Sequence, residues 1–368
     1  MPPVHVMIKP VSGACNMQCR YCFYCDEMAN RTEKVLPPMT LETLEAVVRR
    51  TLIYADDSVT FAFQGGEPTL AGLSFYEALI RLVKQYNGRR LPVRYALQTN
   101  GYDLSDEMIR FFVTNGFLLG VSLDGIRAIH DALRPDRRGG PTYDRVLHTL
   151  ERLRRAGAEY NVLCVVNAQV AAHAQDVYRA LAPHRFIQFI PCLDGLDGKT
   201  QSHSLDEESY LSFLKTTFDL YEQDYRSGHP VSVRQFDNWL QMMLGMPPES
   251  CSMNGRCSLQ FIVESDGSVY PCDFYALDEW KLGSLTQTPL RRMVQSDTAR
   301  KFVEASLAVP EACRACRWYS LCRNGCRRER DPHTGISRWC GVMQGFWSYA
   351  YDRMAAMAET IRQGVSKF

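Results

Sequence analysis

The stretch Cys15-Asn16-Met17-Gln18-Cys19-Arg20-Tyr21-Cys22 places three cysteines in C-x-x-x-C-x-x-C spacing. It follows a short apolar run, residues 4–9, which we expect to be the first strand of the fold. Three thiols at this spacing can hold three corners of a four-iron cubane and leave the fourth iron open to another ligand. A structural zinc ion instead needs four protein ligands, and Cys25 could supply the fourth, so the spacing alone also permits zinc.

The first 230 residues alternate short apolar runs with amphipathic stretches. Each apolar run is bounded by turn residues, which is typical of a buried parallel strand. The expected strands are residues 4–9, 59–63, 93–98, 117–122, 160–166 and 186–190, and the expected helices are residues 41–55, 75–86, 106–115, 143–156 and 175–182. This alternation indicates right-handed β-α-β units. Six strands are too few to close an eight-stranded barrel, so we expect an α/β fold with a partial, open (β/α)6 barrel, although a doubly wound sheet has the same periodicity.

The character of the sequence changes after about residue 231, where the apolar runs shorten and cysteines cluster. Residues 205–226 predict a long helix that leads away from the barrel, and residues 345–362 predict a final helix. The turn Ser265-Asp266-Gly267-Ser268 predicts a hairpin. We therefore expect two domains, a barrel over residues 1–230 and a small cysteine-rich domain over residues 231–368.

The chain of 368 residues contains fourteen cysteines, and twelve of them lie in two groups near its ends. Closely spaced thiols in a chain of this length indicate metal binding rather than the disulfide scaffold of a small secreted domain. A net charge of +1 offers no electrostatic basis for binding nucleic acid or an anionic membrane. Because the start lacks the basic region of a signal peptide and no segment approaches the length of a membrane span, we expect a cytoplasmic protein.

The second group of cysteines reads C-x5-C-x14-C and, after a gap, C-x2-C-x5-C-x3-C followed by a last cysteine. Its members are Cys251, Cys257, Cys272, Cys313, Cys316, Cys322, Cys326 and Cys340. Eight thiols are enough for two fully ligated four-iron clusters. C-x2-C pairs are also common in zinc-binding modules, so zinc stays open for this part of the chain.

Polar motifs follow three of the expected strands. Gln64-Gly65-Gly66-Glu67-Pro68 follows the second strand, Gln98-Thr99-Asn100-Gly101 follows the third, and Ser122-Leu123-Asp124-Gly125 follows the fourth, with Arg134 shortly after. Taken singly, each of these glycine-containing motifs is an ordinary turn, and Arg134 is an ordinary surface charge. Together they fall at the carboxyl ends of the strands, which is the face where barrel enzymes carry out their chemistry.

The cysteine triad and these motifs together resemble the signature of the radical S-adenosylmethionine (SAM) family. The resemblance implies that Cys15, Cys19 and Cys22 hold a [4Fe-4S] cluster that cleaves SAM. It also implies contacts with the amino end, the ribose and the carboxylate of SAM. The residues at those places are Gly65, Gly66, Glu67, Ser122, Asp124 and Arg134.

The second group of cysteines resembles the SPASM domain found in the same family. The resemblance covers about the last hundred residues and implies two auxiliary [4Fe-4S] clusters, so that the chain would carry three clusters in all. The ligands implied for the first auxiliary cluster are Cys251, Cys257, Cys272 and Cys326. The ligands implied for the second are Cys313, Cys316, Cys322 and Cys340.

Further stretches resemble the anaerobic sulfatase-maturating enzymes within this family. They are Pro2-Pro3, Lys9-Pro10, Cys22-Phe23-Tyr24, Phe61-Ala62-Phe63-Gln64-Gly65-Gly66-Glu67-Pro68-Thr69 and Tyr270-Pro271-Cys272-Asp273-Phe274. Those enzymes oxidise a Cys or Ser in a C/S-x-P-x-R segment of an unfolded sulfatase to formylglycine. Because only fourteen residues precede Cys15, we expect the barrel and the SPASM domain to recognise the peptide without a leader-binding domain.

The resemblance also implies roles for other residues and for partners. Asp273 directly follows a cluster cysteine and would be the base that removes the thiol or hydroxyl proton of the target; a carboxylate after Pro-Cys is otherwise often a solvated turn residue. Tyr24 and Gln64 would shape the peptide site, and the alternatives are that Tyr24 packs over the cluster and Gln64 bonds to backbone. A small redox protein, flavodoxin or ferredoxin, would supply electrons to a monomeric enzyme.

Two other functions fit the same sequence. The first is a radical SAM/SPASM maturase of another ribosomal peptide, which forms a thioether or epimerises a residue. The second, from a different class, is a non-catalytic zinc-binding interaction protein.

Overall fold

The structure of the protein is a computed structural model that describes residues 3–364. The chain forms two compact units. The first contains the residues up to Ser122 together with Asp131–Tyr160 and Ser258–Phe302, and the second contains Leu123–His130, Asn161–Cys257 and the residues from Val303 onward. These units interleave along the chain and differ from the contiguous division near residue 230, which stays a prediction.

The first unit is built on a mostly parallel sheet. Its strands are β1 (Val4–Ile8), β2 (Val59–Phe63), β3 (Val93–Thr99), β4 (Phe117–Ser122), β8 (Ile262–Val263), β9 (Ser268–Tyr270) and β10 (Gly283–Ser284). Their order across the sheet is β10-β9-β8-β1-β2-β3-β4. Strands β1 to β4 pair in parallel, so their carboxyl ends lie along one edge of this sheet.

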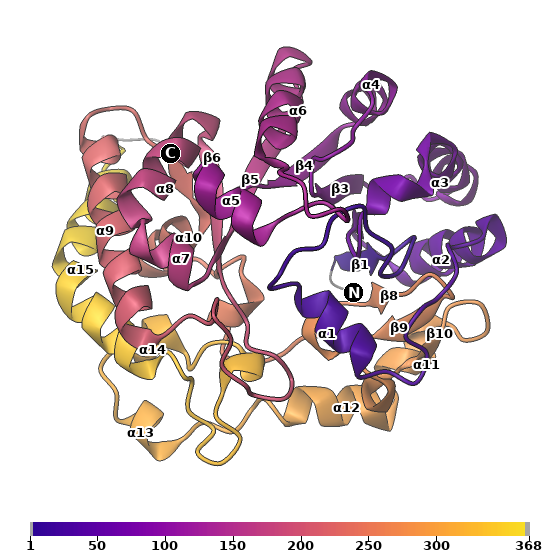
Figure 1. Cartoon of the computed structure of the whole chain (residues 1–368). Coiled ribbons are helices and arrows are strands. Elements are labelled where there is room, and N and C mark those ends of the chain that lie inside the picture. The colour runs from indigo at the N-terminus through magenta and orange to yellow at the C-terminus, as the bar shows by residue number, and fades with distance from the viewer. Residues whose placement is uncertain (1–2, 365–368) are drawn as a thin grey trace. The chain divides into compact units, whose positions relative to one another are not determined.

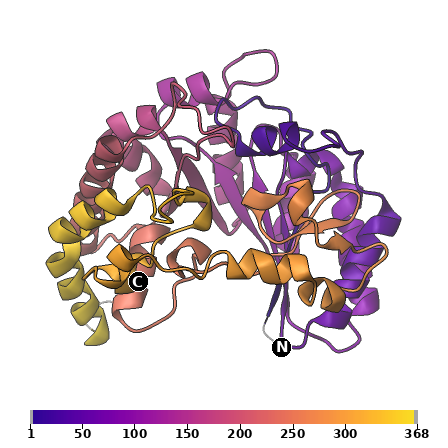
Figure 2. The same ribbon diagram turned by 90° about the horizontal axis from the view of Figure 1, so that it is seen from below.

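The hairpin β8–β9 joins this sheet beside the first strand. Strand β8 pairs in parallel with β1, in the register Met7↔Ile262 and Ile8↔Val263, and the backbone N–H of Lys9 donates to Val263 O at 2.8 Å. Figures 1 and 2 both show this late, orange segment beside the N-terminal strand. The predicted hairpin turn is confirmed, because β8 and β9 are antiparallel. Its place next to β1 has no counterpart among the sequence predictions.

Helices cover the outer side of the strands β1 to β4 (Figure 1). They are α2 (Leu41–Tyr54), α3 (Leu73–Tyr86), α4 (Asp106–Thr114) and α6 (Tyr143–Arg155). Helices α1 (Phe23–Ala29) and α11 (Leu290–Val294) also belong to the first unit. The side chains of Thr40 and Ser105 cap α2 and α4 by accepting hydrogen bonds from backbone N–H groups of the first turn. An aromatic cluster fills the core, in which the buried Phe117 ring lies 4.9 Å from both Phe112 and Tyr95.

The second unit contains three further strands and the two longest helices. Its elements are β5 (Tyr160–Val166), β6 (Phe186–Pro191), β7 (Ser232–Val233), α7 (Ala168–Ala172), α8 (Ala174–Leu181), α9 (Glu207–Arg226), α10 (Arg234–Met243), α13 (Glu311–Arg314), α14 (Tyr319–Cys322) and α15 (Cys340–Arg362). Strands β5, β6 and β7 are parallel. Phe236, Trp239, Phe346 and Trp347 pack α10 against α15. The remaining helices, α5 (Arg127–Leu133) and α12 (Asp297–Glu304), each span a boundary between the units.

The sequence predictions for regular structure are confirmed in most places. All six predicted strands are present, with ends that agree within one residue. The five predicted barrel helices and the long helix α9 agree within two residues, whereas the final helix begins at Cys340, five residues earlier than expected. The strands β7 and β10 are only two residues long, which is too short for a periodicity to show.

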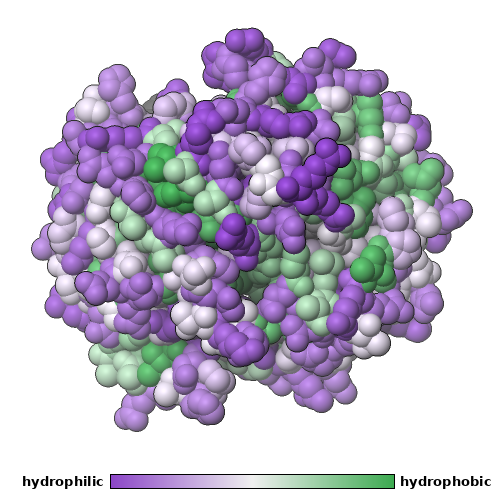
Figure 3. All heavy atoms as spheres, in the orientation of Figure 1, coloured by the Kyte–Doolittle hydropathy of each residue, from purple (hydrophilic) through white to green (hydrophobic). Residues whose placement is uncertain are grey.

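No helix within residues 3–364 is both long and apolar enough to cross a membrane. The face seen in Figure 3 carries mostly hydrophilic side chains, with apolar residues scattered among them.

Candidate functional site

The cysteine triad lies in the loop between β1 and α1 of the first unit, with Cys22 at the N-terminus of α1. All three thiols are half-buried. Cys15 Sγ accepts a hydrogen bond from the Met17 backbone N–H at 3.4 Å, which helps to orient it. A hydrogen bond from the neighbouring Cys25 thiol lowers the pKa of Cys22 to about 6. The thiolate is the form that binds iron, so this part of the loop suits a cluster ligand.

The Gly65-Gly66-Glu67 loop packs directly on the triad loop. Gly66 N–H donates to Ser12 O and Glu67 N–H donates to Ala14 O, both at 2.8 Å. A Cβ atom on Gly66 would come within 2.1 Å of Ala14 O, so only glycine allows this approach. The two loops therefore form one backbone surface at the carboxyl ends of β1 and β2.

Glu67 is fully buried and ties the neighbouring strand ends together. Its carboxylate accepts hydrogen bonds from the Thr69 hydroxyl at 2.7 Å, the Thr99 hydroxyl at 3.0 Å and the Asn100 N–H at 2.7 Å. Burial raises the pKa of Glu67, while these hydrogen bonds act to lower it. Asn100 in turn donates from Nδ2 to Cys15 Sγ at 3.6 Å, so the Glu67 side chain supports the triad through Asn100.

Arg134 is the second group brought to the triad loop. Its side chain is buried, and its guanidinium donates to the Tyr21 hydroxyl at 2.7 Å. The backbone of residues 133–135 also accepts hydrogen bonds from the N–H groups of Gln18 and Arg20. Ser122 is the last residue of β4 in the same unit and is half-buried.

Asp124 belongs to the second unit and is held there at the end of β5. Its side chain is fully buried, and Oδ1 accepts a hydrogen bond from the Val165 N–H at 3.1 Å. The Asp124 backbone N–H donates to His130 Nδ1 at 3.2 Å.

Asp273 is brought to the end of β1 by the β8–β9 hairpin. It follows Cys272, and Oδ1 of its partly exposed carboxylate lies 2.7 Å from Nζ of Lys9, whose side chain is fully buried. Sequence reasoning gave Lys9 no role. The signal was present, because a lysine that continues a buried strand run is unusual in a folded protein.

Tyr24 and Gln64, the predicted peptide contacts, differ in exposure. Tyr24 is 2% exposed, and its hydroxyl donates to buried Glu264 at 2.5 Å. Gln64 directly follows β2 and is half-buried, and its backbone N–H donates to Ile8 O at 3.0 Å.

The four cysteines implied for the second auxiliary cluster line one cavity of the second unit, of about 50 Å³. They are Cys313, Cys316, Cys322 and Cys340. Burial, together with the charges of the other three thiols, raises the pKa of Cys322 to about 11. Iron would relieve this repulsion, because metal binding stabilises thiolates. Within residues 3–364, no group of three or more His, Cys, Asp or Glu side chains is arranged to hold a single metal ion.

Three of the four cysteines implied for the first auxiliary cluster lie in the second unit. They are Cys251, Cys257 and Cys326. Burial, together with the charges of Glu329, Cys251 and Cys257, raises the pKa of Cys326 to about 12. The fourth, Cys272, belongs to the first unit.

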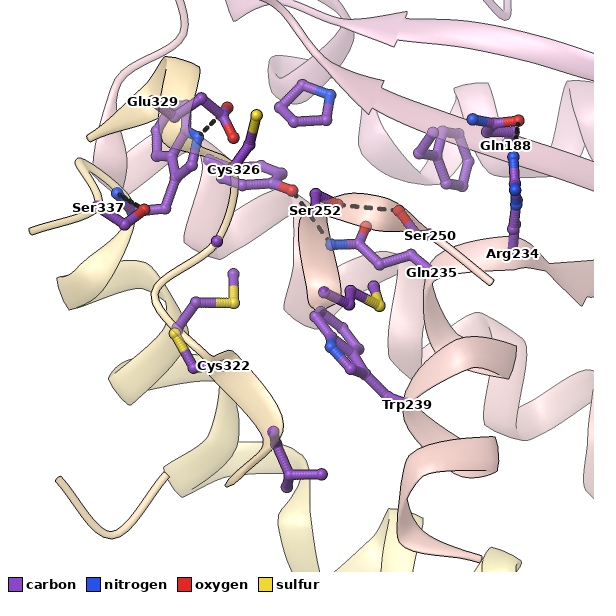
Figure 4. Close-up of a pocket in the computed structure, with 18 residues that line it drawn as sticks. Gln188, Arg234, Gln235, Trp239, Ser250, Ser252, Cys322, Cys326, Glu329 and Ser337 are labelled. Atoms are coloured by element: carbon purple, nitrogen blue, oxygen red, sulfur yellow. Dashed lines mark hydrogen bonds between the residues drawn. The ribbon is translucent and has the colours of Figure 1, made fainter. Parts of the chain in front are cut away.

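A larger cavity of about 120 Å³ adjoins Cys326 and Cys322 (Figure 4). Aromatic side chains, among them Trp239 and Tyr210, form part of its wall. Its polar groups are paired with one another: Arg234 donates to Gln188 at 3.0 Å, and Trp339 donates to Glu329 at 2.6 Å.

Comparisons with known proteins agree with this arrangement. The radical SAM superfamily matches residues 10–180, and the iron–sulfur cluster-binding SPASM domain matches residues 251–317. The chain is 41% identical to a cysteine-type anaerobic sulfatase-maturating enzyme of Clostridium novyi, over 98% of this chain and 99% of that protein. It is 29% identical to a serine-type enzyme of Klebsiella pneumoniae, over 96% of this chain and 88% of that protein.

Solved structures show the same relationship. The structure described as native anSMEcpe with bound AdoMet and Cp18Cys peptide has a TM-score of 0.93 and 39% identity, over 98% of this chain and all of that chain. Streptococcus suis SuiB bound to its precursor peptide SuiA has a TM-score of 0.66 over 93% of this chain and 76% of that chain, and at 14% identity it supports the fold alone. The predicted partial barrel with a SPASM domain is thus confirmed. The chain belongs to the anaerobic sulfatase-maturating enzymes of the radical SAM family.

Proposed function

We propose that the protein oxidises a cysteine in a C-x-P-x-R segment of an unfolded sulfatase to formylglycine. The observation that carries this proposal is the 41% identity, over 98% of the chain, to a cysteine-type sulfatase-maturating enzyme. The lower identity of 29% to serine-type enzymes favours cysteine over serine as the target. When bound, SAM and the clusters supply a radical that takes a hydrogen atom from Cβ of the target and an acceptor for the remaining electron.

The chain holds SAM with the loops at the carboxyl ends of β1, β2 and β4. In this proposal, the Gly65 and Gly66 backbone receives the amino end of SAM, and Glu67 holds this loop in shape. Ser122, Asp124 and Arg134 contact the ribose and carboxylate. Support comes from the buried position of Arg134 against the triad loop, where a carboxylate would meet a fixed guanidinium.

Eleven cysteines would hold three [4Fe-4S] clusters. The triad holds the cluster that binds SAM, and the two sets of four named above hold the auxiliary clusters. The shared cavity of Cys313, Cys316, Cys322 and Cys340 supports the second auxiliary set. The charges of Cys251 and Cys257 contribute to the raised pKa of Cys326, which supports these three members of the first auxiliary set.

Asp273 acts as the base in this proposal. Once Cβ has lost a hydrogen atom, the thiol proton must leave for a thioaldehyde to form, and hydrolysis of the thioaldehyde gives formylglycine. Asp273 lies directly after a cluster ligand, and its carboxylate is fixed on one side by Lys9. Gln64 contacts the peptide. Tyr24 shapes the site through its ring, which packs against the ammonium group of Lys9.

An acidic redox protein of the flavodoxin or ferredoxin type would donate electrons. Between Cys313 and Cys340 the chain has seven arginines and two acidic residues. Such a basic segment attracts an acidic partner and speeds its association. We also propose that the enzyme is a cytoplasmic monomer that takes its substrate as an unfolded segment.

A peptide assay tests the function. We expect the cluster-loaded enzyme, given SAM and a reductant, to convert a Cys-x-Pro-x-Arg peptide to an aldehyde that an aldehyde-reactive probe captures, with the matching mass change. A Ser-x-Pro-x-Arg peptide should react more slowly, and an Ala-x-Pro-x-Arg peptide is the control. A thioether or epimer as the product would favour the alternative maturase function instead.

The iron content tests the clusters. We expect about twelve irons per chain in the fully loaded enzyme. Replacing Cys15, Cys19 and Cys22 together by Ala should remove about a third of the iron and all formation of 5′-deoxyadenosine. Replacing Cys164 and Cys192, which lie outside the cluster sets, is the control for loss of thiols. 5′-Deoxyadenosine formed by the triple variant would place the SAM-cleaving cluster elsewhere.

The Gly66 backbone is testable by adding one methyl group. Gly66→Ala pushes Cβ against Ala14 O, and overpacking of this kind costs about 1–3 kcal/mol. We expect weaker SAM binding and 5′-deoxyadenosine formation reduced at least ~10-fold, measured by equilibrium dialysis and by chromatography. Gly88→Ala, where the methyl group meets nothing within 4 Å, is the control. Unchanged SAM binding in Gly66→Ala would contradict the proposed role.

Asp273→Asn keeps the size of the side chain and removes its basicity. We expect this variant to bind SAM, keep its iron and form 5′-deoxyadenosine, while formylglycine formation falls by ~10²–10⁴-fold. Glu279→Gln, an exposed carboxylate in the same segment, is the matched control. Near-normal aldehyde formation by fully loaded Asp273→Asn would refute the assignment, and loss of iron would make Asp273 structural.

A further inference from the structure

The side chain of Lys9 is fully buried, so its ammonium group needs an opposite charge beside it. Of the lysines between residues 3 and 364, Lys9 alone has a fully buried side chain. An ammonium group removed from water destabilises a fold unless an opposite charge lies against it. Asp273 supplies that charge, with Oδ1 at 2.7 Å from Lys9 Nζ.

The ammonium group of Lys9 has a second contact that fixes its position. Nζ lies 3.7 Å from the centroid of the Tyr24 ring, which is close enough for a cation–π interaction. Burial acts to lower the pKa of Lys9, but the charges of Asp273, Tyr24, Glu264 and Glu27 outweigh it and raise the pKa above its ordinary value. Lys9 therefore stays charged beside Asp273.

The Tyr24 ring that supports Lys9 is itself held in place. The Tyr24 hydroxyl donates to Glu264 at 2.5 Å, and Arg31 donates to the same carboxylate oxygen at 2.8 Å. Tyr24, Arg31 and Glu264 are all buried. Burial raises the pKa of Glu27 to about 8, while the charge of Lys9 acts to lower it.

The aliphatic stem of Lys9 is confined on its other side by the Gly65-Gly66-Glu67 loop. A Cβ atom on Gly65 would lie 3.1 Å from Lys9 Cβ and 3.3 Å from Lys9 Cγ. The Lys9 backbone N–H donates to Val263 O in β8, the first strand of the hairpin that leads to Asp273. Lys9 thus touches both the loop that would hold SAM and the segment that carries Asp273.

Asp273 has little else to hold its carboxylate. It begins a short 3-10 turn, Asp273–Tyr275, and within residues 3–364 its Oδ1 has no hydrogen-bond partner other than the ion pair with Lys9. A carboxylate on a turn rotates about two side-chain bonds unless something fixes it. The ion pair is therefore the contact that sets its orientation.

We propose that Lys9 is a positioning residue for the oxidation: its ammonium group holds one oxygen of Asp273 so that the other faces the proton of the target thiol. This inference rests on the proposed function. Lys9 does not touch the substrate in this proposal and acts only through Asp273.

The test compares four cluster-loaded enzymes: wild type, Lys9→Met, Asp273→Asn and the double variant. Methionine matches the length of the lysine stem without its charge. We expect Lys9→Met to keep its iron and its SAM affinity, with kcat for formylglycine reduced ~10–100-fold and KM for the peptide nearly unchanged. It should form more 5′-deoxyadenosine per aldehyde than wild type. Lys84→Met, at an exposed lysine of α3, is the matched control.

The double variant separates positioning from general damage. If Lys9 acts through Asp273, adding Lys9→Met to Asp273→Asn should lower kcat no further. A drop equal to the sum of the two single effects, or a wild-type kcat in Lys9→Met, would overturn the proposal. The double variant leaves neither charge without its partner, so its melting temperature should exceed that expected from the two single variants.

Two outcomes keep this inference separate from the proposed function. A wild-type enzyme that makes no aldehyde from the Cys-x-Pro-x-Arg peptide refutes the function. A wild-type enzyme that makes aldehyde, together with an equally active Lys9→Met, refutes only the role of Lys9. If Lys9→Met does not fold, the comparison of the double variant with Asp273→Asn decides: equal rates support the role, and a further loss refutes it.

Discussion

The parallel pairing of β8 with β1 is the contact on which the proposed site in the first unit depends. Two residue pairs and the backbone hydrogen bonds from Met7 to Phe261 and from Lys9 to Val263 fix the hairpin against the strand that leads into the cysteine triad. Without that pairing, no sheet contact would hold the segment that carries Asp273 beside the strand that leads into the triad. With it, the proposed base, which follows β9, and the triad loop, which follows β1, belong to one sheet in which only β8 lies between those two strands.

A second backbone surface complements this pairing. The glycines after β2 let that loop bond to Ser12 and Ala14 at the start of the triad loop. Glu67 then reaches across to Thr99 and Asn100 at the end of β3. The site is thus built from strand ends and their backbone, which hold side chains more firmly than free loops do.

The sequence predicts local structure here better than it predicts contacts between distant segments. The six strands and their helices show in periodicity, because each is a continuous run of residues with its own caps and turns. The cysteine spacing points to clusters for the same reason. The Lys9–Asp273 pair was not predicted, because it depends on a sheet register between segments that lie far apart in the sequence. The grouping of eight scattered thiols into two sets came from resemblance to a family, and spacing alone would have allowed several groupings.

The same β8–β1 pairing has a consequence for how the chain is made. Strand β1 emerges from the ribosome first, yet its partner on one side is not synthesised until more than two thirds of the chain has followed. Pairings between such distant segments form slowly, because a long loop must close first. Until then one edge of β1 is an open template for other strands. The protein therefore completes this sheet only after most of the chain has been synthesised, and a delay in this step prolongs the exposure of the open edge of β1 to other strands.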